Sequence, residues 1–414
     1  MASQANGETG APVLVKARPA APKFKAVLTL DGGGTRGVIS VMVLHKLEEL
    51  IKANIRDRGL AEGDFEIDLA DYFDMVAGTS IGSITALYLA SRGAASGEVL
   101  RSPEFLEVTG GTPARQGSVA AVEALFRAQA KVIFPKLMFA NSRLVGLARA
   151  KAGPQFASDG LAQVLQGAFG DMRLSQCATG VVVPTFELNT SRPVDFWVVC
   201  EGGDPRETGR TEVKTRSVVP EGEQLMPHSD PAGVHWDPDR SYLPGDYKLR
   251  EVAAASAAFP GMFAASSITH PDGSSRIYAD GGLIASNPTI SALTFLRVKE
   301  DVPLEETAVL SIGTGVVLPD RLKVKDSGIF DWIFTGGLVS LLLDQKSEYV
   351  QSVVDGMFYK VLHSEIGQYT RIQIAVDQEN EFGIDTEALS SVTNPEMLDE
   401  LMEIGRRLAN SSEK

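Results

Sequence analysis

The sequence predicts an α/β fold built on a mostly parallel sheet with crossover helices. Three observations lead to this prediction: an apolar strand pattern, a glycine-rich turn directly after it, and apolar residues at helical spacing after the turn. This strand–turn–helix pattern occurs twice within residues 24–91. Consecutive units of this kind place their strands side by side in parallel, because each helix crosses back over the sheet.

The first unit begins with residues 24–30, Phe-Lys-Ala-Val-Leu-Thr-Leu, which predict a buried strand. Apolar residues at helical spacing over 38–55 predict the helix. Between them, residues 31–37 read Asp-Gly-Gly-Gly-Thr-Arg-Gly. Three successive glycines carry a high entropic cost for a simple turn. Their N–H groups at a helix start favour an anion-binding nest, for a phosphate or for the oxyanion of a tetrahedral intermediate.

The second unit contains a candidate nucleophile. Residues 71–77 predict a short strand and 83–91 a helix rich in Ala, Leu and Ile. Between them, Gly78-Thr-Ser80-Ile-Gly82 has the nucleophile-elbow pattern, in which a serine sits on a sharp turn flanked by small residues. The positive end of the following helix would favour developing negative charge at Ser80. A tight structural turn with an idle serine remains the alternative.

A serine nucleophile requires a proton acceptor. The chain has five histidines: His45, His228, His235, His270 and His363. His228 and His235 lie in a polar segment, and the sequence around the late His363 is typical of the edge of an ordinary strand or helix. Asp280 follows a short strand at 277–279 and precedes Gly281 and Gly282, which permit close approach of another group. A desolvated carboxylate can accept a serine proton, so Asp280 is the candidate base. A turn-initiating Asp-Gly is the alternative.

The remaining segments define the expected organisation. Residues 1–23, rich in Ala, Pro and Gly, predict a flexible tail. Residues 201–246 are rich in Gly, Pro and charged residues and predict a surface insertion. Further elements are predicted at 180–184, 194–199, 249–259 and 307–312, the last running into Gly313-Thr314-Gly315. We expect a catalytic domain at 24–316 and a mostly helical extension at 317–414 packed on it, with an apolar run at 333–343 and a polar helix at 395–409.

Composition excludes some classes of function. The net charge of −14 argues against nucleic-acid binding, which needs a cationic surface. It also argues against purely electrostatic docking on anionic lipid, although a small apolar rim could still reach a membrane. Cys177 and Cys200 lack metal-type spacing. No signal peptide and no spanning apolar segment of about 20 residues stands out, so we expect a soluble, cytoplasmic protein.

Taken together, the motifs resemble the patatin-like phospholipase family. That family carries a glycine-rich loop with arginine, then Gly-x-Ser-x-Gly, then a late Asp-Gly-Gly, and here these are residues 31–37, 78–82 and 280–282. The small-residue segment 253–260, Asn287-Pro288 and the segment 311–315 resemble later landmarks of the family. Ser286 replaces the commoner asparagine before Asn287-Pro288. The resemblance covers roughly residues 24–316.

The resemblance implies a three-layer α/β/α fold and a Ser–Asp dyad without histidine. Ser80 would attack an acyl ester and Asp280 would take its proton, without metal or cofactor. The family's loop and elbow roles map onto Gly32, Gly33, Gly34 and Arg36, and onto Gly78 and Gly82. In this scheme the N–H groups of Gly33 and Gly34 hold the oxyanion, while Gly32 and Arg36 support the loop. Arg36 could instead contact a lipid phosphate through two hydrogen bonds.

The implied substrate is a glycerolipid or phospholipid, cleaved in a phospholipase A or galactolipase-like reaction during transient peripheral membrane contact. A non-catalytic or weakly active storage or defence effector on the same fold is the first alternative. A sugar kinase or actin-like ATPase is the second, since such proteins open with Asp-Gly-Gly-Gly-Thr, but it leaves residues 78–82 and 280–282 unexplained. Two hypotheses concern the remaining segments: residues 333–343 line an acyl tunnel or membrane rim, and residues 201–246 form a lid or partner surface.

Overall fold

A computed structural model of the chain describes residues 13–15, 24–93, 99–135, 154, 156–200, 242–243, 245–317, 337–364, 367–376, 383–390 and 392–411. Most of the predicted tail and of the insertion 201–246 lies outside these residues. So do residues 333–336 and the side chains of 337–343, so the two hypotheses on these segments stay predictions.

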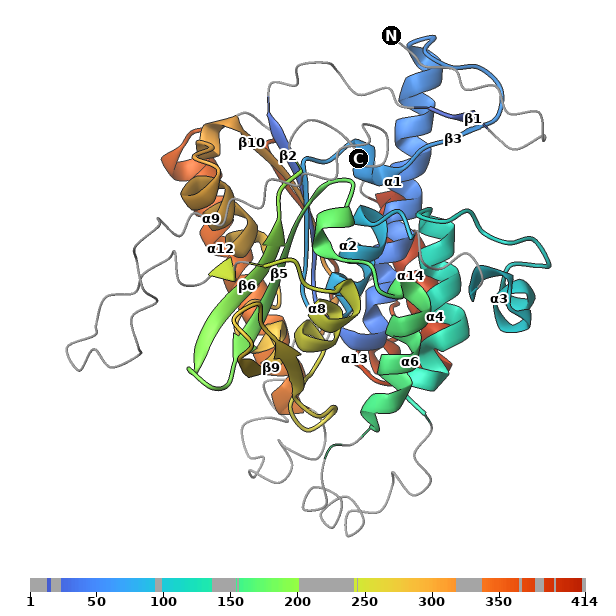
Figure 1. Cartoon of the computed structure of the whole chain (residues 1–414). Coiled ribbons are helices and arrows are strands. Elements are labelled where there is room, and N and C mark those ends of the chain that lie inside the picture. The colour runs from blue at the N-terminus through green and yellow to red at the C-terminus, as the bar shows by residue number, and fades with distance from the viewer. Residues whose placement is uncertain are drawn as a thin grey trace.

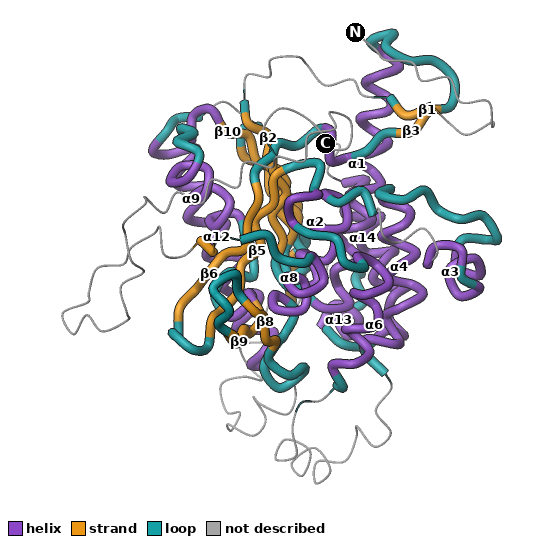
Figure 2. The backbone as a smooth tube through the Cα atoms, viewed as in Figure 1, coloured by secondary structure: helices purple, strands orange, loops and turns teal. Residues whose placement is uncertain are grey.

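The described residues build a nine-stranded sheet at the centre of the molecule (Figures 1 and 2). Its order is β12–β10–β2–β4–β5–β6–β7, with β9 paired to β5 and β8 paired to β9. The strands from β12 to β5 are parallel, whereas β6 and β9 run antiparallel to β5. The strand bounds are β2 Lys25–Leu30, β4 Met75–Gly78, β5 Gly180–Glu187, β6 Arg192–Val198, β7 Tyr242–Leu243, β8 Ser266–Thr269, β9 Ser275–Asp280, β10 Thr307–Ile312 and β12 Tyr369–Ile372.

Helices cover both faces of this sheet (Figure 1). Their bounds are α1 Gly37–Asp57, α2 Ile81–Ala90, α3 Pro103–Val108, α4 Val119–Ile133, α6 Ser158–Phe169, α8 Leu249–Ser256, α9 Thr289–Lys299, α12 Gly337–Asp355, α13 Thr386–Ser390 and α14 Leu398–Ser411. A π-helical turn, Gly356–Val361, continues α12. Two short parallel pairs lie outside the main sheet: β1 Val13–Leu14 with β3 Phe65–Glu66, and β11 Val316–Val317 with β13 Ala375–Val376.

Alternation along the central strands creates two apolar cores. Val27 of β2 packs with α9 and α12, while Leu28 and Leu30 pack with the larger layer that contains α1, α2, α4, α6 and α8. Both faces of β2 are therefore buried, as expected for a parallel strand between helical layers. The predicted three-layer α/β/α fold with a mostly parallel sheet is confirmed.

Two predicted elements differ from the structure. The strand expected at 71–77 begins only at Met75, because Leu69–Asp71 instead forms a 3-10 helical turn. The helix expected to be polar at 395–409 is amphipathic in α14: Leu401 and Met402 are fully buried. Gly405 lets α14 approach α1 closely, since an added Cβ would lie 2.8 Å from the Met42 side chain.

Candidate active site

Strand directions bring Ser80 and Asp280 together from distant parts of the chain. Strand β4 pairs with the first residues of β5 and ends at Gly78, two residues before Ser80. Strand β9 pairs with the last residues of β5 along the same edge but runs in the opposite direction, so that Asp280 lies opposite Thr185. The two strand ends therefore point at each other, and the elbow fills the space between them.

The elbow holds Ser80 in a strained backbone conformation. Ser80 has φ 54° and ψ −124°, and positive φ is rare for residues other than glycine. The turn also requires Gly78 and Gly82, because a Cβ at Gly78 would overlap the carbonyl of Gly82, and one at Gly82 the carbonyl of Leu30. The sharp turn leaves the Ser80 side chain on the wall of a cavity at the start of α2.

The Ser80 hydroxyl donates a hydrogen bond to the Asp280 carboxylate, with 2.7 Å between Oγ and Oδ2. The other carboxylate oxygen, Oδ1, accepts the N–H of Gly282 at 2.6 Å. Asp280 is only 1% exposed, and burial raises its pKa to about 7, against the opposing effect of the hydrogen bonds from Ser80 and Gly282. The group is therefore poised to gain or lose a proton near neutral pH.

The glycine-rich loop lies beside Ser80. Leu30 of β2 is paired with Gly78 of β4, so both strand-to-helix turns leave the sheet at the same level. An added Cβ on Gly32 would lie 3.3 Å from the Ser80 Cβ. Gly32 itself is fixed by two bonds: its N–H donates to Ser286 O at 2.9 Å, and its carbonyl accepts the Thr314 hydroxyl at 2.8 Å.

The next two residues of the loop, Gly33 and Gly34, also lie at the cavity. Both line the cavity beside Ser80, and within the described residues their N–H groups have no acceptor. Gly34 has φ 58°, and a Cβ there would overlap the carbonyl of Val392. Two adjacent N–H groups next to a hydroxyl are the arrangement that stabilises a tetrahedral oxyanion.

Arg36 does not face the cavity. Its side chain is 1% exposed, and its Nη2 donates to Asp344 Oδ1 at 2.8 Å while its Nη1 donates to Gly315 O at 3.0 Å. These contacts tie the end of the glycine-rich loop to Gly315 and Asp344, away from the cavity. This burial contradicts the alternative in which Arg36 contacts a lipid phosphate.

Sequence reasoning missed Ser256, which supports the elbow from α8. Its hydroxyl accepts the N–H of Ser80 at 3.0 Å and donates to Pro184 O at 2.8 Å. Ala258, just beyond α8, accepts the N–H of Asp280 at 3.0 Å. One short segment therefore fixes the backbone of both residues. A serine within an alanine-rich helix was the available signal.

Two of the described histidines are engaged elsewhere, and the third, His363, is exposed. His45 bonds Glu123 at 2.9 Å, and His270 is buried between two tyrosine hydroxyls, Tyr247 at 2.9 Å and Tyr278 at 2.5 Å. No histidine in the described ranges hydrogen-bonds Ser80, and His228 and His235 lie outside them. Asp280 is therefore the titratable partner that the structure gives Ser80.

The cavity has a volume of about 580 Å³, part of it open to solvent. Its polar side chains are those of Ser80 and Asp280, beside the glycine-rich loop. The rest is apolar, contributed by α2, α4, α6 and the segment after α8: Ile81, Ile84, Ile133, Phe134, Leu161, Phe259, Met262 and Phe263. An apolar chain of several carbons, with a polar reacting group at its end, matches this distribution.

Across the described residues, no group of three or more His, Cys, Asp or Glu side chains is placed to hold a metal ion. Among the described helices, none has the length and apolar character that crossing a membrane requires.

The chain is similar to known proteins. A family model described as patatin-like phospholipase matches residues 28–293. Patatin-like protein 2 of Oryza sativa subsp. indica is 27% identical over 380 residues, which cover 86% of this chain and 78% of that protein. A cGAMP-activated phospholipase of Vibrio cholerae serotype O1 is 27% identical over 400 residues, covering 92% and 90%.

A solved structure, VipD from Legionella pneumophila, aligns over 99% of this chain and 70% of that one, with a TM-score of 0.33 and 12% identity. This similarity is too low to add to the assignment, which rests on the family model and the sequence relatives. The chain belongs to the patatin-like phospholipase family, and its general activity is that of a lipid acyl hydrolase.

Proposed function

We propose that the protein hydrolyses fatty acyl esters of glycerolipids, phospholipids among them, with Ser80 as nucleophile and Asp280 as its base. The observation that carries the proposal is the 2.7 Å hydrogen bond between the two side chains in the wall of an otherwise mostly apolar cavity. A phospholipase A or galactolipase-like reaction has these requirements: an activated hydroxyl, an oxyanion site and room for an acyl chain.

The chemistry starts with an acyl chain in the apolar part of the cavity and its ester carbonyl beside Ser80. Ser80 Oγ attacks the carbonyl carbon while its proton passes to Asp280 Oδ2. The N–H groups of Gly33 and Gly34 donate hydrogen bonds to the carbonyl oxygen as negative charge develops on it. Asp280 then returns the proton to the departing alcohol, which leaves an acyl-enzyme on Ser80. Water, deprotonated by Asp280, then attacks the acyl carbonyl carbon. The bond to Ser80 Oγ breaks, Asp280 returns the proton to Ser80 Oγ, and the fatty acid leaves.

The kinase or ATPase alternative predicts different surroundings for Asp31. A kinase or ATPase that used residues 31–35 as a phosphate turn would need Asp31 accessible to a metal–nucleotide complex. Instead the Asp31 carboxylate is 2% exposed and paired with Arg371. A storage or defence effector without activity remains a testable alternative, since its fold would be the same. The proposal includes transient contact with a lipid surface, because the substrate has to enter the cavity from one.

The test measures hydrolysis of a short-chain p-nitrophenyl ester and of phosphatidylcholine vesicles, both with chelator present. Wild type is compared with Ser80→Ala and Asp280→Ala. We expect turnover in wild type on both substrates and loss in both variants. Wild-type protein that is inactive on every ester would favour the effector alternative. Turnover that survives Ser80→Ala would contradict the proposed nucleophile.

A further inference from the structure

We propose that Asp344 and Arg371, both from the segment after residue 316, are positioning residues that hold the glycine-rich loop in its oxyanion-binding conformation. This inference rests on the proposed function, since it assigns a role within the same site. It places part of the reaction's machinery outside residues 28–293, where the family model matches.

Each end of the loop carries one buried charge, and each charge is paired with the C-terminal segment. At the start, Asp31 receives two hydrogen bonds from Arg371: Nη1 to Oδ1 at 2.8 Å and Nη2 to Oδ2 at 2.5 Å. At the end, Arg36 donates to Asp344 at 2.8 Å. All four side chains are at most 6% exposed. Charges so far from water require a partner in a defined geometry, so each pair fixes where the loop begins and ends.

Helix α12 contacts both ends of the loop from one face. Asp344 and Ser347 are three residues apart and therefore lie on the same side of the helix. The Ser347 hydroxyl donates to Asp31 Oδ2 at 2.6 Å and accepts from Arg371 Nη2 at 2.8 Å. On the same helix, Lys346 donates to the carbonyl of Leu283, three residues after Asp280. Helix α12 thus contacts the loop and the Asp280 turn together.

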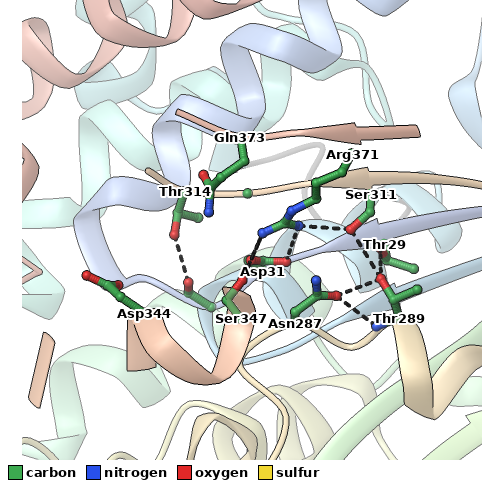
Figure 3. Close-up of polar contacts among 12 residues, drawn as sticks. Thr29, Asp31, Asn287, Thr289, Ser311, Thr314, Asp344, Ser347, Arg371 and Gln373 are labelled. Carbon is green, nitrogen blue, oxygen red and sulfur yellow. Dashed lines mark hydrogen bonds and ion pairs between the residues drawn. The ribbon is translucent and has the colours of Figure 1, made fainter. Parts of the chain in front are cut away.

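Arg371 also connects the start of the loop to the central sheet (Figure 3). Its Nη1 also donates to Ser311 on β10 at 2.8 Å, and Ser311 lies 3.1 Å from Thr289 at the start of α9. Thr289 in turn bonds Thr29 of β2 at 2.8 Å. The base of the loop therefore belongs to a continuous buried network across β2, β10 and β12.

The loop itself offers little to fix its middle. Gly33 and Gly34 have no side chains, and glycine backbone has access to more conformations than any other. Thr35 is held by one further contact from the C-terminal segment, its N–H to Val392 O at 3.0 Å. Oxyanion stabilisation depends on donors that are already oriented when charge develops. Without the two ion pairs, the N–H groups of Gly33 and Gly34 would point in a range of directions.

The test uses Asp344→Asn, which removes one charge at nearly constant shape, and the milder Ser347→Ala. The matched control is Asp301→Asn, which removes the acid of an exposed Arg297–Asp301 pair on the protein surface. Three quantities are measured: kcat and KM on a short-chain ester, the inhibition constant of an acyl trifluoromethyl ketone, and the melting temperature. The ketone forms a tetrahedral adduct with the serine and therefore reports on the oxyanion site.

We expect kcat of Asp344→Asn to fall about 10- to 100-fold with KM within about twofold, because misplaced groups cost this much without affecting ground-state binding. The ketone should bind more weakly by the same factor as kcat/KM falls. Ser347→Ala should show the same pattern with a smaller loss, and Asp301→Asn should match wild type. A melting temperature that falls while kcat per fluorophosphonate-titrated site stays at the wild-type value would overturn the inference.

Hydrogen exchange separates this inference from the proposed function. Amides of a peptide covering residues 31–37 should exchange faster in Asp344→Asn than in wild type or Asp301→Asn, whether or not an ester is turned over. Unchanged exchange would contradict the positioning role of Asp344 and leave the proposed function standing. Activity that survives Ser80→Ala would instead overturn the proposed function and, with it, the catalytic meaning of the loop.

Discussion

The elbow at residues 78–82 and the loop at residues 31–37 are both strand-to-helix turns on neighbouring strands, yet they are held in different ways. The elbow is closed mainly by its own backbone: the N–H of Gly82 donates to Thr79 O at 2.8 Å, and that of Ser83 to Ser80 O at 2.9 Å. The loop is closed by side chains about three hundred residues away, Asp344 and Arg371. All residues of a motif can therefore be present in one short segment while the hydrogen bonds that fix its conformation come from distant residues.

The largest expected effect breaks the elbow's chemistry. Ser80→Ala and Asp280→Asn should each reduce kcat by about 10⁴-fold, because neither the nucleophile nor its base can be replaced by the other. Turnover of a short-chain ester is the measurement, with melting temperature as the control for folding. More than a tenth of wild-type kcat in Ser80→Ala would remove that serine from the mechanism.

The next effect breaks the loop without touching a charge. Gly34→Ala places a methyl group against the Val392 carbonyl at a positive φ. We expect kcat to fall about 10²- to 10³-fold, the range for loss of an oxyanion donor. The control is Gly356→Ala, where an added Cβ has no neighbour within 4 Å and φ is not positive. Equal activity of the two variants would contradict an oxyanion role for the loop.

The pH dependence of kcat/KM also distinguishes the elbow from the loop, because Ser80 of the elbow is hydrogen-bonded to Asp280, which titrates near neutral pH. Asp280 acts as base only when ionised, and its pKa is raised to about 7. We expect kcat/KM to fall about tenfold per pH unit below 7 and to level off above it. A profile of kcat/KM from pH 5 to 9 is the measurement. A flat profile through pH 7 would contradict Asp280 as the base.

The same carboxyl should lower stability as the pH rises. Its folded pKa lies above the ordinary aspartate value of 3.8, so ionisation opposes folding: the cost is absent below about pH 4 and complete above about pH 7. Asp280→Asn should therefore gain unfolding free energy relative to wild type, by up to roughly 4 kcal/mol at pH 8 and far less at pH 4. Urea unfolding at both pH values measures this. Some pH dependence will persist in the variant, because burial also raises the pKa of Asp195 to about 7. An equal gain at both pH values would contradict the raised pKa.

The smallest expected effect concerns the hydrogen bond from the N–H of Ser80 to the Ser256 hydroxyl. Among the described contacts, this bond links the backbone of Ser80 to a residue far away in the chain. Ser256→Ala leaves the buried N–H of Ser80 without its acceptor, which should cost about 1–3 kcal/mol of unfolding free energy. We expect only a several-fold loss of kcat, because the local bonds of the elbow remain. Ser352→Ala, an exposed serine on α12, is the control. A loss as large as that of Gly34→Ala would mean that the elbow depends on distant contacts as much as the loop does.

These differences explain what the sequence could predict. The elbow residues Gly78, Ser80 and Gly82 stand in one short segment, and the need for Gly78 follows from its close approach to Gly82 within that segment. The parallel sheet followed in the same way from local strand–turn–helix patterns. Both predictions depend on interactions between residues close in the chain.

The rest depends on pairings that a single sequence does not specify. With 39 basic and 53 acidic residues in the chain, nothing local selects Asp344 for Arg36 or Arg371 for Asp31. The antiparallel course of β9, which turns Asp280 toward Ser80, is likewise set by pairing with β5. Ser256 was visible within a segment of small residues, but its bond to Ser80 depends on how α8 packs.

The most direct test of the Ser80–Asp280 account is covalent labelling with an alkyl fluorophosphonate, read out by intact mass and peptide mapping. The phosphonate bonds to an activated serine oxygen with loss of fluoride, so it reports the nucleophile without requiring the natural substrate. We predict one adduct, on the peptide that contains Ser80, formed more slowly at pH 5 than at pH 8 and absent in Ser80→Ala. No adduct on wild type, or the same adduct on Ser80→Ala, would contradict the account.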